Sequence, residues 1–263
     1  MGHGRGASAL AAIAMGLAIA VSSAPRAGAD TAEAIAAADA AYARGDLAAS
    51  ESAAAAAVQA QPSNFAALWR LARAESELGE DAKGEDQRRL IASAVEHART
   101  AVKAAPDSAK GHEWLAVALG RQALKEGPKT RLALSREIKS EVDRALALDP
   151  SSGRAYHVRA LWNRKLASLN LLERMAANTV LGGVPKGASM DNCVNDLKKA
   201  IELEPGYVNH HLELGRTYMD LKRWADARHE LDRALSLPPT SNPRDPRYQQ
   251  DARELLGKLP KKG

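Results

Sequence analysis

Val208–Pro239 reads VNHHLELGRTYMDLKRWADARHELDRALSLPP and directly follows a Pro-Gly turn. Its apolar and small residues recur every three or four positions, which is the period of an α-helix. Gly215, Ala227 and Ala234 are small enough to let two helices approach closely, and a proline ends the second helix. The stretch therefore predicts two closely packed helices joined by a short turn.

The order of residues in this stretch is that of a structural repeat. Leu214-Gly215 and Tyr218 are followed by Ala227, then by an Ala-Leu pair and a proline. This order resembles the helix-turn-helix signature of the tetratricopeptide (TPR) repeat, which is about 34 residues long. We therefore expect an all-α, TPR-like α-solenoid of about five helix-turn-helix units over residues 30–263. The expected units are 31–62, 65–106, 109–150, 153–205 and 208–239, followed by a capping helix at 246–259.

Composition agrees with closely stacked helices. Aromatic residues make up 4% of the chain, with a single Phe, so a core of large side chains is excluded. The formal net charge of +5 comes from basic and acidic residues that are interleaved along the chain, which is typical of a solvated helical surface and not of a nucleic-acid partner. The only cysteine, Cys193, excludes an intramolecular disulfide, and we expect it to be a buried small residue.

Three of the five units carry insertions. The second and third have about ten extra residues each, at Glu80–Arg89 and around Lys125–Thr130. Longer helices or a longer loop would absorb them. Insertions at equivalent points of successive repeats should project from the same side of a solenoid.

The largest insertion, Arg164–Met190, interrupts the fourth unit. Apolar residues between 166 and 176 follow helical spacing, whereas the glycines and proline of 181–187 predict a loop. Ser189 or Asp191 would cap the returning helix. We expect the apolar stripe of the 166–176 helix to fill the groove of the solenoid. The alternative is that it binds a partner.

The inserted helix and loop also carry a family resemblance. The motifs Ala200-Ile-Glu-Leu-Glu-Pro205 and Leu214-Gly215-Arg216, together with Tyr156–Leu161 and Leu172–Pro185, are similar to those of the regulator of microtubule dynamics family, over roughly residues 90–258. The resemblance implies a TPR-like fold, and eukaryotic members are linked to microtubules and organelle contacts. A weaker similarity, in architecture and location alone, is to the T-component TPR proteins of periplasmic TRAP transporters.

Residues 1–29 have the pattern of a secretory signal peptide. A short positive segment with Arg5 precedes an apolar stretch from Ala7 to Val21, and Ala27-Gly28-Ala29 supplies a cleavage site. The apolar stretch is too short and too rich in alanine for a transmembrane span. We therefore expect a periplasmic or secreted protein that begins near Asp30 and has no transmembrane span after cleavage.

No catalytic pattern is present in the sequence. His112-Glu113 and His229-Glu230 both lack the second histidine of a zinc-protease helix, and the Gly-x-Ser-x-Gly, Walker and dinucleotide-binding patterns are missing. The adjacent His210-His211 would point about 100° apart on a helix, so they are poor ligands for one ion. We expect a protein that is not an enzyme and uses no metal or cofactor.

The remaining candidate site is the groove lined by the first helix of each unit. Transferring the TPR groove positions onto the units gives a surface that is net basic in its middle, with a tryptophan near one end. Arginines there could form bidentate contacts with the carboxylates of an acidic peptide. The expected partner-binding residues are Trp69, Arg73, Lys110, Glu113, Arg121, Arg154, His157, Arg164, Lys165, Asn209 and Arg216, and Glu77 and Asp220 also occupy groove positions.

Two hypotheses for function follow. The first is an exported scaffold that binds a protein or peptide in this groove. The alternative is a periplasmic transport accessory or small-ligand carrier, which would require a closed apolar cavity under the insertion at 166–187. The sequence leaves the partner and the oligomeric state open.

Overall fold

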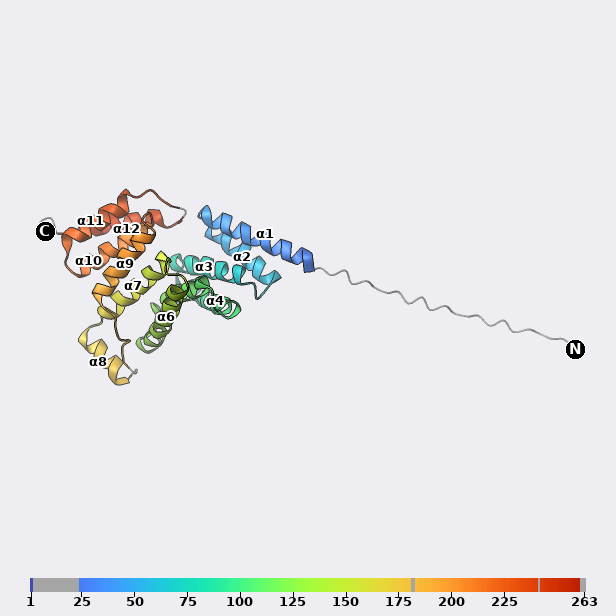
Figure 1. The fold of residues 1–263 in the computed structure, drawn as a ribbon, viewed down its shortest axis with the longest axis horizontal. Coiled ribbons are helices and arrows are strands. Elements are labelled where there is room, and N and C mark those ends of the chain that lie inside the picture. The colour runs from blue at the N-terminus through green and yellow to red at the C-terminus, as the bar shows by residue number, and fades with distance from the viewer. Residues whose placement is uncertain (2–23, 181–182, 241, 261–263) are drawn as a thin grey trace.

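The computed structural model describes residue 1 and residues 24–180, 183–240 and 242–260, and every regular element within these ranges is an α-helix (Figure 1). Most of the expected signal peptide, residues 2–23, and Leu181-Gly182 of the expected loop lie outside the described residues. In chain order the helices are α1 (Ala24–Ala43), α2 (Leu47–Ala60), α3 (Phe65–Asp81), α4 (Gly84–Ala104), α5 (Ala109–Ala123), α6 (Pro128–Leu148), α7 (Gly153–Ala167), α8 (Leu171–Val180), α9 (Met190–Leu203), α10 (Val208–Asp220), α11 (Trp224–Ser236) and α12 (Asp245–Lys258).

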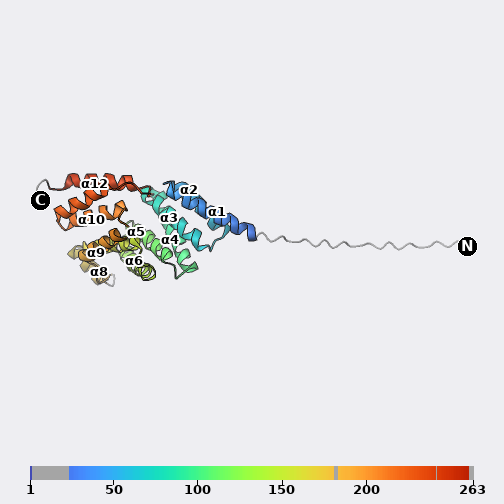
Figure 2. The same cartoon turned by 45° about the horizontal axis from the view of Figure 1, so that its top comes forward.

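The helices form five hairpins that stack along the chain. They are α1–α2, α3–α4, α5–α6, α7–α9 and α10–α11, and the second helix of each hairpin packs on the first helix of the next. First helices also touch one another, as α3 does α1 and α5. α12 contacts both α11 and α10, so it occupies the place of the first helix of a sixth unit (Figure 2). This is the capping helix that the sequence predicts.

The small residues of the repeat hold the hairpins at close range. A Cβ added to Gly215 on α10 would lie 2.8 Å from two carbon atoms of Leu231 on α11, too close for any side chain. Ala72, Ala116 and Ala160 take the same place in three other units and are fully buried. Close approach is therefore built into four of the five hairpins at one repeat position.

Longer second helices absorb the ten extra residues of the second and third units. α4 and α6 each have 21 residues, against 13 in α11. Two equivalent contacts locate the added length. His112 on α5 contacts Glu141 on α6 at a sequence separation of 29, and His211 on α10 contacts Glu230 on α11 at a separation of 19. The extra residues therefore lie before this contact, at the beginning of the second helix.

The insertion in the fourth unit departs from the expected helix at 166–176. α7 ends at Ala167 and α8 starts afresh at Leu171. Asn170 begins the new helix: its side chain accepts the Glu173 N–H at 2.9 Å, and its own N–H donates to the Glu173 carboxylate at 2.8 Å. This reciprocal capping box fixes a helix start where continuous periodicity predicted none.

The expectation that this helix fills the groove is wrong. Leu171 and Leu172 are 73% and 76% exposed, and Met175 is also exposed. Only Leu166 and Leu169, which precede the break, pack into the core shared by α3–α7. The guanidinium of Arg174 donates to carbonyls at the end of α7, which turns α8 away from the stack. α8 therefore lies at the edge of the molecule (Figure 1).

Local features around the insertions and turns follow the sequence. Gly183 and Gly187 both have positive φ in the loop that returns to α9, and Ser189 caps α9 by accepting the Asn192 N–H. Cys193 is fully buried, as expected of a small core residue. In the first unit, Gly45 at φ +79° makes the turn between α1 and α2, and Asp46 caps α2.

Candidate functional site

The expected groove residues lie on one face, which we call the inner face: the side of α3, α5 and α7 that carries Arg73, Glu77, Glu113, Arg121 and Arg154. Each comes from the first helix of its unit, at positions where the helix turns away from its own hairpin partner. The repeat pattern assigned these side chains to the groove, and their role in binding a partner stays a prediction. What the pattern did not reveal is that this face is covered.

The cover is the link between α11 and α12, of which residues 237–240 and 242–244 are described. Its non-helical backbone is held by its own side chains. Asp245 accepts from the N–H and hydroxyl of Thr240, and Asn242 accepts the Arg244 N–H at 3.0 Å. Pro243 packs against Gly45, in the turn between α1 and α2, so the link reaches from the last hairpin to the first.

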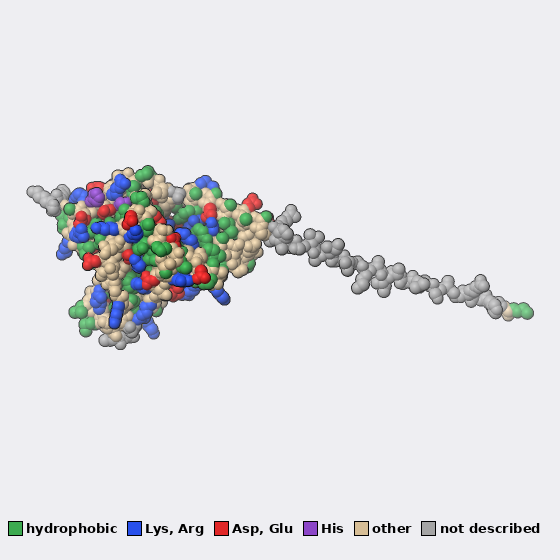
Figure 3. Space-filling view, in the orientation of Figure 1, with side chains coloured by type: hydrophobic (Ala, Val, Ile, Leu, Met, Phe, Trp, Pro, Cys, Tyr) green, Lys and Arg blue, Asp and Glu red, His purple; other side chains and the backbone are tan. Residues whose placement is uncertain are grey.

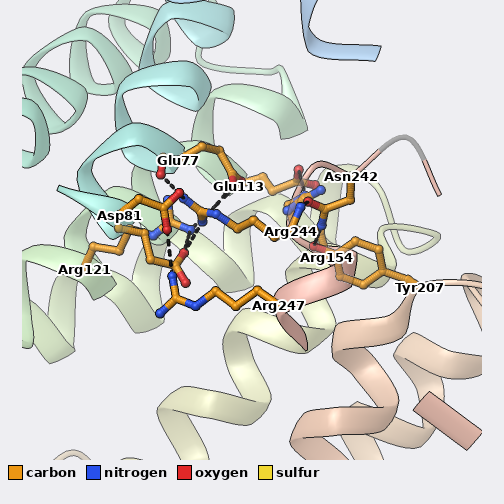
Figure 4. A network of polar contacts seen from close by, with 10 residues as sticks. Glu77, Asp81, Glu113, Arg121, Arg154, Tyr207, Asn242, Arg244 and Arg247 are labelled. Carbon is orange, nitrogen blue, oxygen red and sulfur yellow. Dashed lines mark hydrogen bonds and ion pairs between the residues drawn. The ribbon is translucent and has the colours of Figure 1, made fainter. Parts of the chain in front are cut away.

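Arg244 is the main contact of the link with the inner face (Figure 4). Its guanidinium is 2.9 Å from Glu77 Oε2 and 3.1 Å from Asp81 Oδ2, and it also donates to Glu80 and to the backbone carbonyl of Glu77. The side chains of Arg244 and Glu77 are 3% and 4% exposed, so this ion pair is almost fully removed from water. Arg121 on α5 shares the Glu80 carboxylate at 2.5 Å.

The other end of the inner face is organised around Glu113, which is 1% exposed. Its carboxylate accepts from Ser152 Oγ at 2.6 Å and from Lys110 Nζ at 3.2 Å, and lies 3.5 Å from Arg154 Nε. Arg154 also stacks over the rings of Trp114 and Tyr207, at 4.8 and 5.6 Å from their centroids. The charge of Arg154 is thus held by both a carboxylate and aromatic faces.

Tyr207 joins this end of the inner face to the link. Its hydroxyl accepts a hydrogen bond from Asn242 Nδ2 at 3.0 Å. Burial raises the pKa of Tyr207 to about 12, because the phenolate would lose its hydration there. Tyr207 therefore stays a neutral phenol between Arg154 and Asn242.

Two buried histidines connect α7 and α10 below Tyr207. The Nδ1 atoms of His157 and His210 are 2.9 Å apart, and His210 Nε2 is 3.1 Å from Glu204. Both contacts are satisfied when His157 donates to His210 and His210 donates to Glu204, which leaves both rings neutral. Burial lowers the pKa of each histidine, and the neighbouring ring and Arg154 lower that of His157 further.

Some of the remaining predicted residues are held in ion pairs within the molecule, and others are open to solvent. Arg164 pairs with Glu213 at 2.6 Å, and Arg216 bridges Glu213 and Asp251 of α12. Arg73 is buried between Asp39 and the ring of Tyr42. The side chains that remain at least partly open to solvent include Trp69, Lys110, Lys165, Asn209, Arg216 and Asp220.

The charge balance of the inner face differs from the basic groove that the sequence predicted. That estimate did not include Glu80, Asp81 and Glu213, which neutralise the arginines opposite them. It also did not include Arg244 and Asn242, because the polar link carries no helical periodicity. The one signal was composition: a proline-rich stretch with Arg244 directly before the capping helix and Arg247 in the first turn of that helix.

Within the described ranges no three His, Cys, Asp or Glu side chains are placed to hold a metal ion. A cavity of about 340 Å³ lies beside the insertion and is lined by Arg174, Asn178 and the segment Val184–Ala188. The cavity is open to solvent and its walls mix charged and polar side chains with apolar ones, so it is not the closed apolar chamber that a small-ligand carrier would need. In the part of the chain that the structure covers, no helix is long and apolar enough to cross a bilayer.

Solved structures with a similar backbone are TPR proteins and their relatives. A thermophilic TPR protein of Thermus thermophilus aligns with a TM-score of 0.63 at 20% identity, over 84% of this chain and 98% of that one. PilW, described as a widely conserved type IV pilus biogenesis factor, aligns with a TM-score of 0.52 at 18% identity, over 89% and 91%. At these identities the likeness shows the fold, and the expected TPR-like solenoid is confirmed.

Sequence comparison supports the resemblance carried by the insertion. The family described as Regulator of microtubule dynamics protein 1-3 matches residues 34–260. Protein 3 of Rattus norvegicus is 33% identical over 196 residues, which are 73% of this chain but 41% of the relative. Protein 1 of Caenorhabditis elegans is 29% identical over 191 residues, 73% of this chain and 84% of the relative. The match extends over nearly all of the five hairpins and the capping helix, and the chain belongs to the regulator of microtubule dynamics protein 1-3 family.

Proposed function

We propose that this protein is an exported interaction scaffold whose inner face binds an extended segment of a partner protein, in the place that its own link occupies. The family and the TPR fold support an interaction scaffold. The use of the inner face and the export of the chain are parts of the proposal. The second hypothesis, a small-ligand carrier, receives no support from the cavity beside α8, which is open to solvent and has mixed walls.

The observation that carries the proposal is the link itself. It is a non-helical segment that lies against the end of α3 and the residue before α10, and two of its side chains hold it there: Asn242 contacts Tyr207 and Arg244 contacts Glu77. An extended partner segment would use the same contacts. The link is therefore an intramolecular example of the ligand class that the inner face accepts.

Unsatisfied donors on the inner face point to the same class. Arg73 Nε and Arg121 Nη1 are buried and have no acceptor among the described residues. Buried donors of this kind are normally hydrogen-bonded, and the carbonyl groups of an extended peptide are suitable acceptors. The partner segment would also carry an arginine or lysine over Glu77 and Asp81, which differs from the wholly acidic partner expected from the sequence.

Export rests on the sequence of residues 1–29 alone. α1 begins at Ala24, so cleavage after Ala29 would shorten this helix by its first six residues and leave the rest of the first hairpin intact. The family match begins at residue 34, after the expected cleavage site. The folded hairpins that carry the inner face would therefore be unchanged in the mature chain.

Site-specific cross-linking in intact cells tests both parts together. A photoreactive amino acid at Trp69, which is partly exposed at one end of the inner face, should form an adduct with one partner protein. The matched control is the same group at Ala133, exposed on the second helix α6, where no adduct should form. Mass spectrometry of the Trp69 adduct should identify the partner and show a chain that begins near Asp30.

The outcomes separate the two parts. Equal adducts at Trp69 and Ala133, or none at Trp69, would contradict binding at the inner face. An adducted chain that still carries residues 1–29 would contradict cleavage while leaving the binding site supported.

A further inference from the structure

The exposed apolar end of α8 has a different chemistry from the inner face. Leu171 and Leu172 begin the helix with almost three quarters of each side chain in water, and exposed Met175 follows one turn later. Leaving large aliphatic side chains in solvent forgoes the stabilisation that burial would bring. An apolar group that projects from the stack therefore marks a surface that contacts something outside this molecule.

Basic residues surround this end. Lys165 lies in the last turn of α7, Arg174 on α8, and Lys186 in the loop after it. Lys165 and Lys186 are exposed and form no ion pair within the described ranges, whereas the single nearby acid of α8, Glu173, is engaged as a helix cap. Arg174 and Lys186 also line the same cavity. The α8 tip, defined by Leu171, Leu172 and these three basic residues, is thus apolar at its end and positive at its base.

Shape and size decide what fits such a tip. α8 lies at the periphery in both ribbon views, and the surface of its lobe carries hydrophobic and basic side chains (Figures 1, 2 and 3). A stable protein interface covers about 800 Å² on each partner, which a ten-residue helix with two leucines at its start does not supply. A second copy of the chain would oppose like charges. A projecting apolar end with positively charged side chains around it is complementary to a bilayer surface that carries anionic headgroups.

We infer that the α8 tip docks on an anionic phospholipid bilayer: Leu171 and Leu172 enter the outer apolar layer, and Lys165, Arg174 and Lys186 contact the phosphates. The contact is reversible, because a few apolar side chains and a small basic cluster give weak binding unless a second attachment adds to them. This inference does not depend on the inner face: Lys165 shares α7 with Arg154 but lies in its last turn, and the other residues of the tip lie on α8 and in the loop after it. A partner bound there would be presented close to the membrane.

A reporter attached to α8 tests this directly. The only native cysteine, Cys193, is fully buried, so an environment-sensitive fluorophore can be attached at a new cysteine in the full chain. With the label at Leu172→Cys, vesicles of phosphatidylglycerol and phosphatidylcholine should shift the emission to shorter wavelength, and a quencher placed in the bilayer should reduce it. Phosphatidylcholine vesicles alone should require at least about tenfold more lipid for the same change.

Matched variants isolate the tip. The control label is at Leu124→Cys, since Leu124 is another exposed leucine, 61% accessible, in the turn after α5; it should not respond. Because both labelled chains contain residues 1–29, any attachment through that segment is common to them. Lys165→Glu with Lys186→Glu in the Leu172→Cys chain should raise the lipid requirement by about tenfold or more.

Three results would overturn the inference: no response at Leu172→Cys, an equal response at Leu124→Cys, or equal responses to anionic and neutral vesicles. A response at Leu172→Cys to cell extract freed of lipid, but not to vesicles, would assign the tip to a protein partner instead. Circular dichroism and thermal unfolding of each variant confirm that the labelled chains are folded.

Discussion

The inner face and the α8 tip differ in which kind of side chain is buried and which is exposed. On the inner face, charged groups are buried and compensated, as Arg244 is by Glu77. On the tip, Leu171 and Leu172 are left in water. The first surface is made by the repeat and the second by its interruption. Repeat positions therefore locate the inner face but do not tell whether another segment covers it. The exposed leucines of the tip lie where the insertion interrupts the repeat.

The largest effect on stability is expected from removing the buried charge of the link. Arg244→Ala would leave Glu77 buried without its nearest cation, and the loss of one partner from a buried ion pair costs about 3 kcal/mol. We expect a value near this lower limit because Arg121 remains 4.0 Å from Glu77. Urea unfolding followed by circular dichroism measures the free energy.

Arg247→Ala is the matched control. Arg247 pairs with the Asp81 carboxylate at 2.6 Å, but its side chain is 54% exposed, so the change should cost less than about 1 kcal/mol. If the two variants proved equally stable, the link would not be closed over the inner face in solution.

A smaller effect is expected from pH. His157 and His210 have pKa values below the ordinary 6.5, because burial disfavours the imidazolium and Arg154 and Arg164 face His157. The unfolded chain then binds more protons than the folded one, so stability falls as the pH drops below about 6.5, by about 1 kcal/mol per unit for one group. His157→Gln should flatten the fall in the urea-unfolding free energy between about pH 6.5 and 5.

His97 gives the opposite sign and serves as the control. The hydrogen bond that His97 donates to the Glu75 carboxylate raises the pKa of His97, so its contribution to stability is fully present below 6.5 and is lost as the pH rises through the raised value. His97→Gln should therefore change the profile above 6.5 and leave the acid limb unaltered. An unchanged acid limb in His157→Gln would mean that the two buried rings are not neutral together in the folded state.

The sequence could predict those features that depend on residues close together in the chain. Helical periodicity and small residues are local, and they correctly predicted the helical hairpins and the burial of Cys193. The break before α8 depends on a capping box formed by Asn170 and Glu173, which competes with continuing apolar spacing. Periodicity alone could not decide between the two.

The covering of the inner face by the link could not be predicted from local sequence patterns. Arg244 contacts residues more than 160 positions earlier in the chain, and that distance is closed only when all five hairpins stack. The link has no period, and its prolines indicate only that it is not helical. The repeat positions therefore predicted which residues line the groove, but not that acidic side chains and the link neutralise and cover the arginines among them.

The smallest effect on stability is expected at the α8 tip. Leu171→Ser with Leu172→Ser removes apolar surface that is already in water, so the free energy of unfolding should change by less than about 0.5 kcal/mol. Leu231→Ala, at a fully buried leucine of the α10–α11 hairpin, should cost about 3 kcal/mol in the same urea titration. A cost at the tip that approached the cost at Leu231 would show that the two leucines pack against the body in solution. The contrast with the inner face would then be lost, and the tip would have no apolar surface to offer a bilayer.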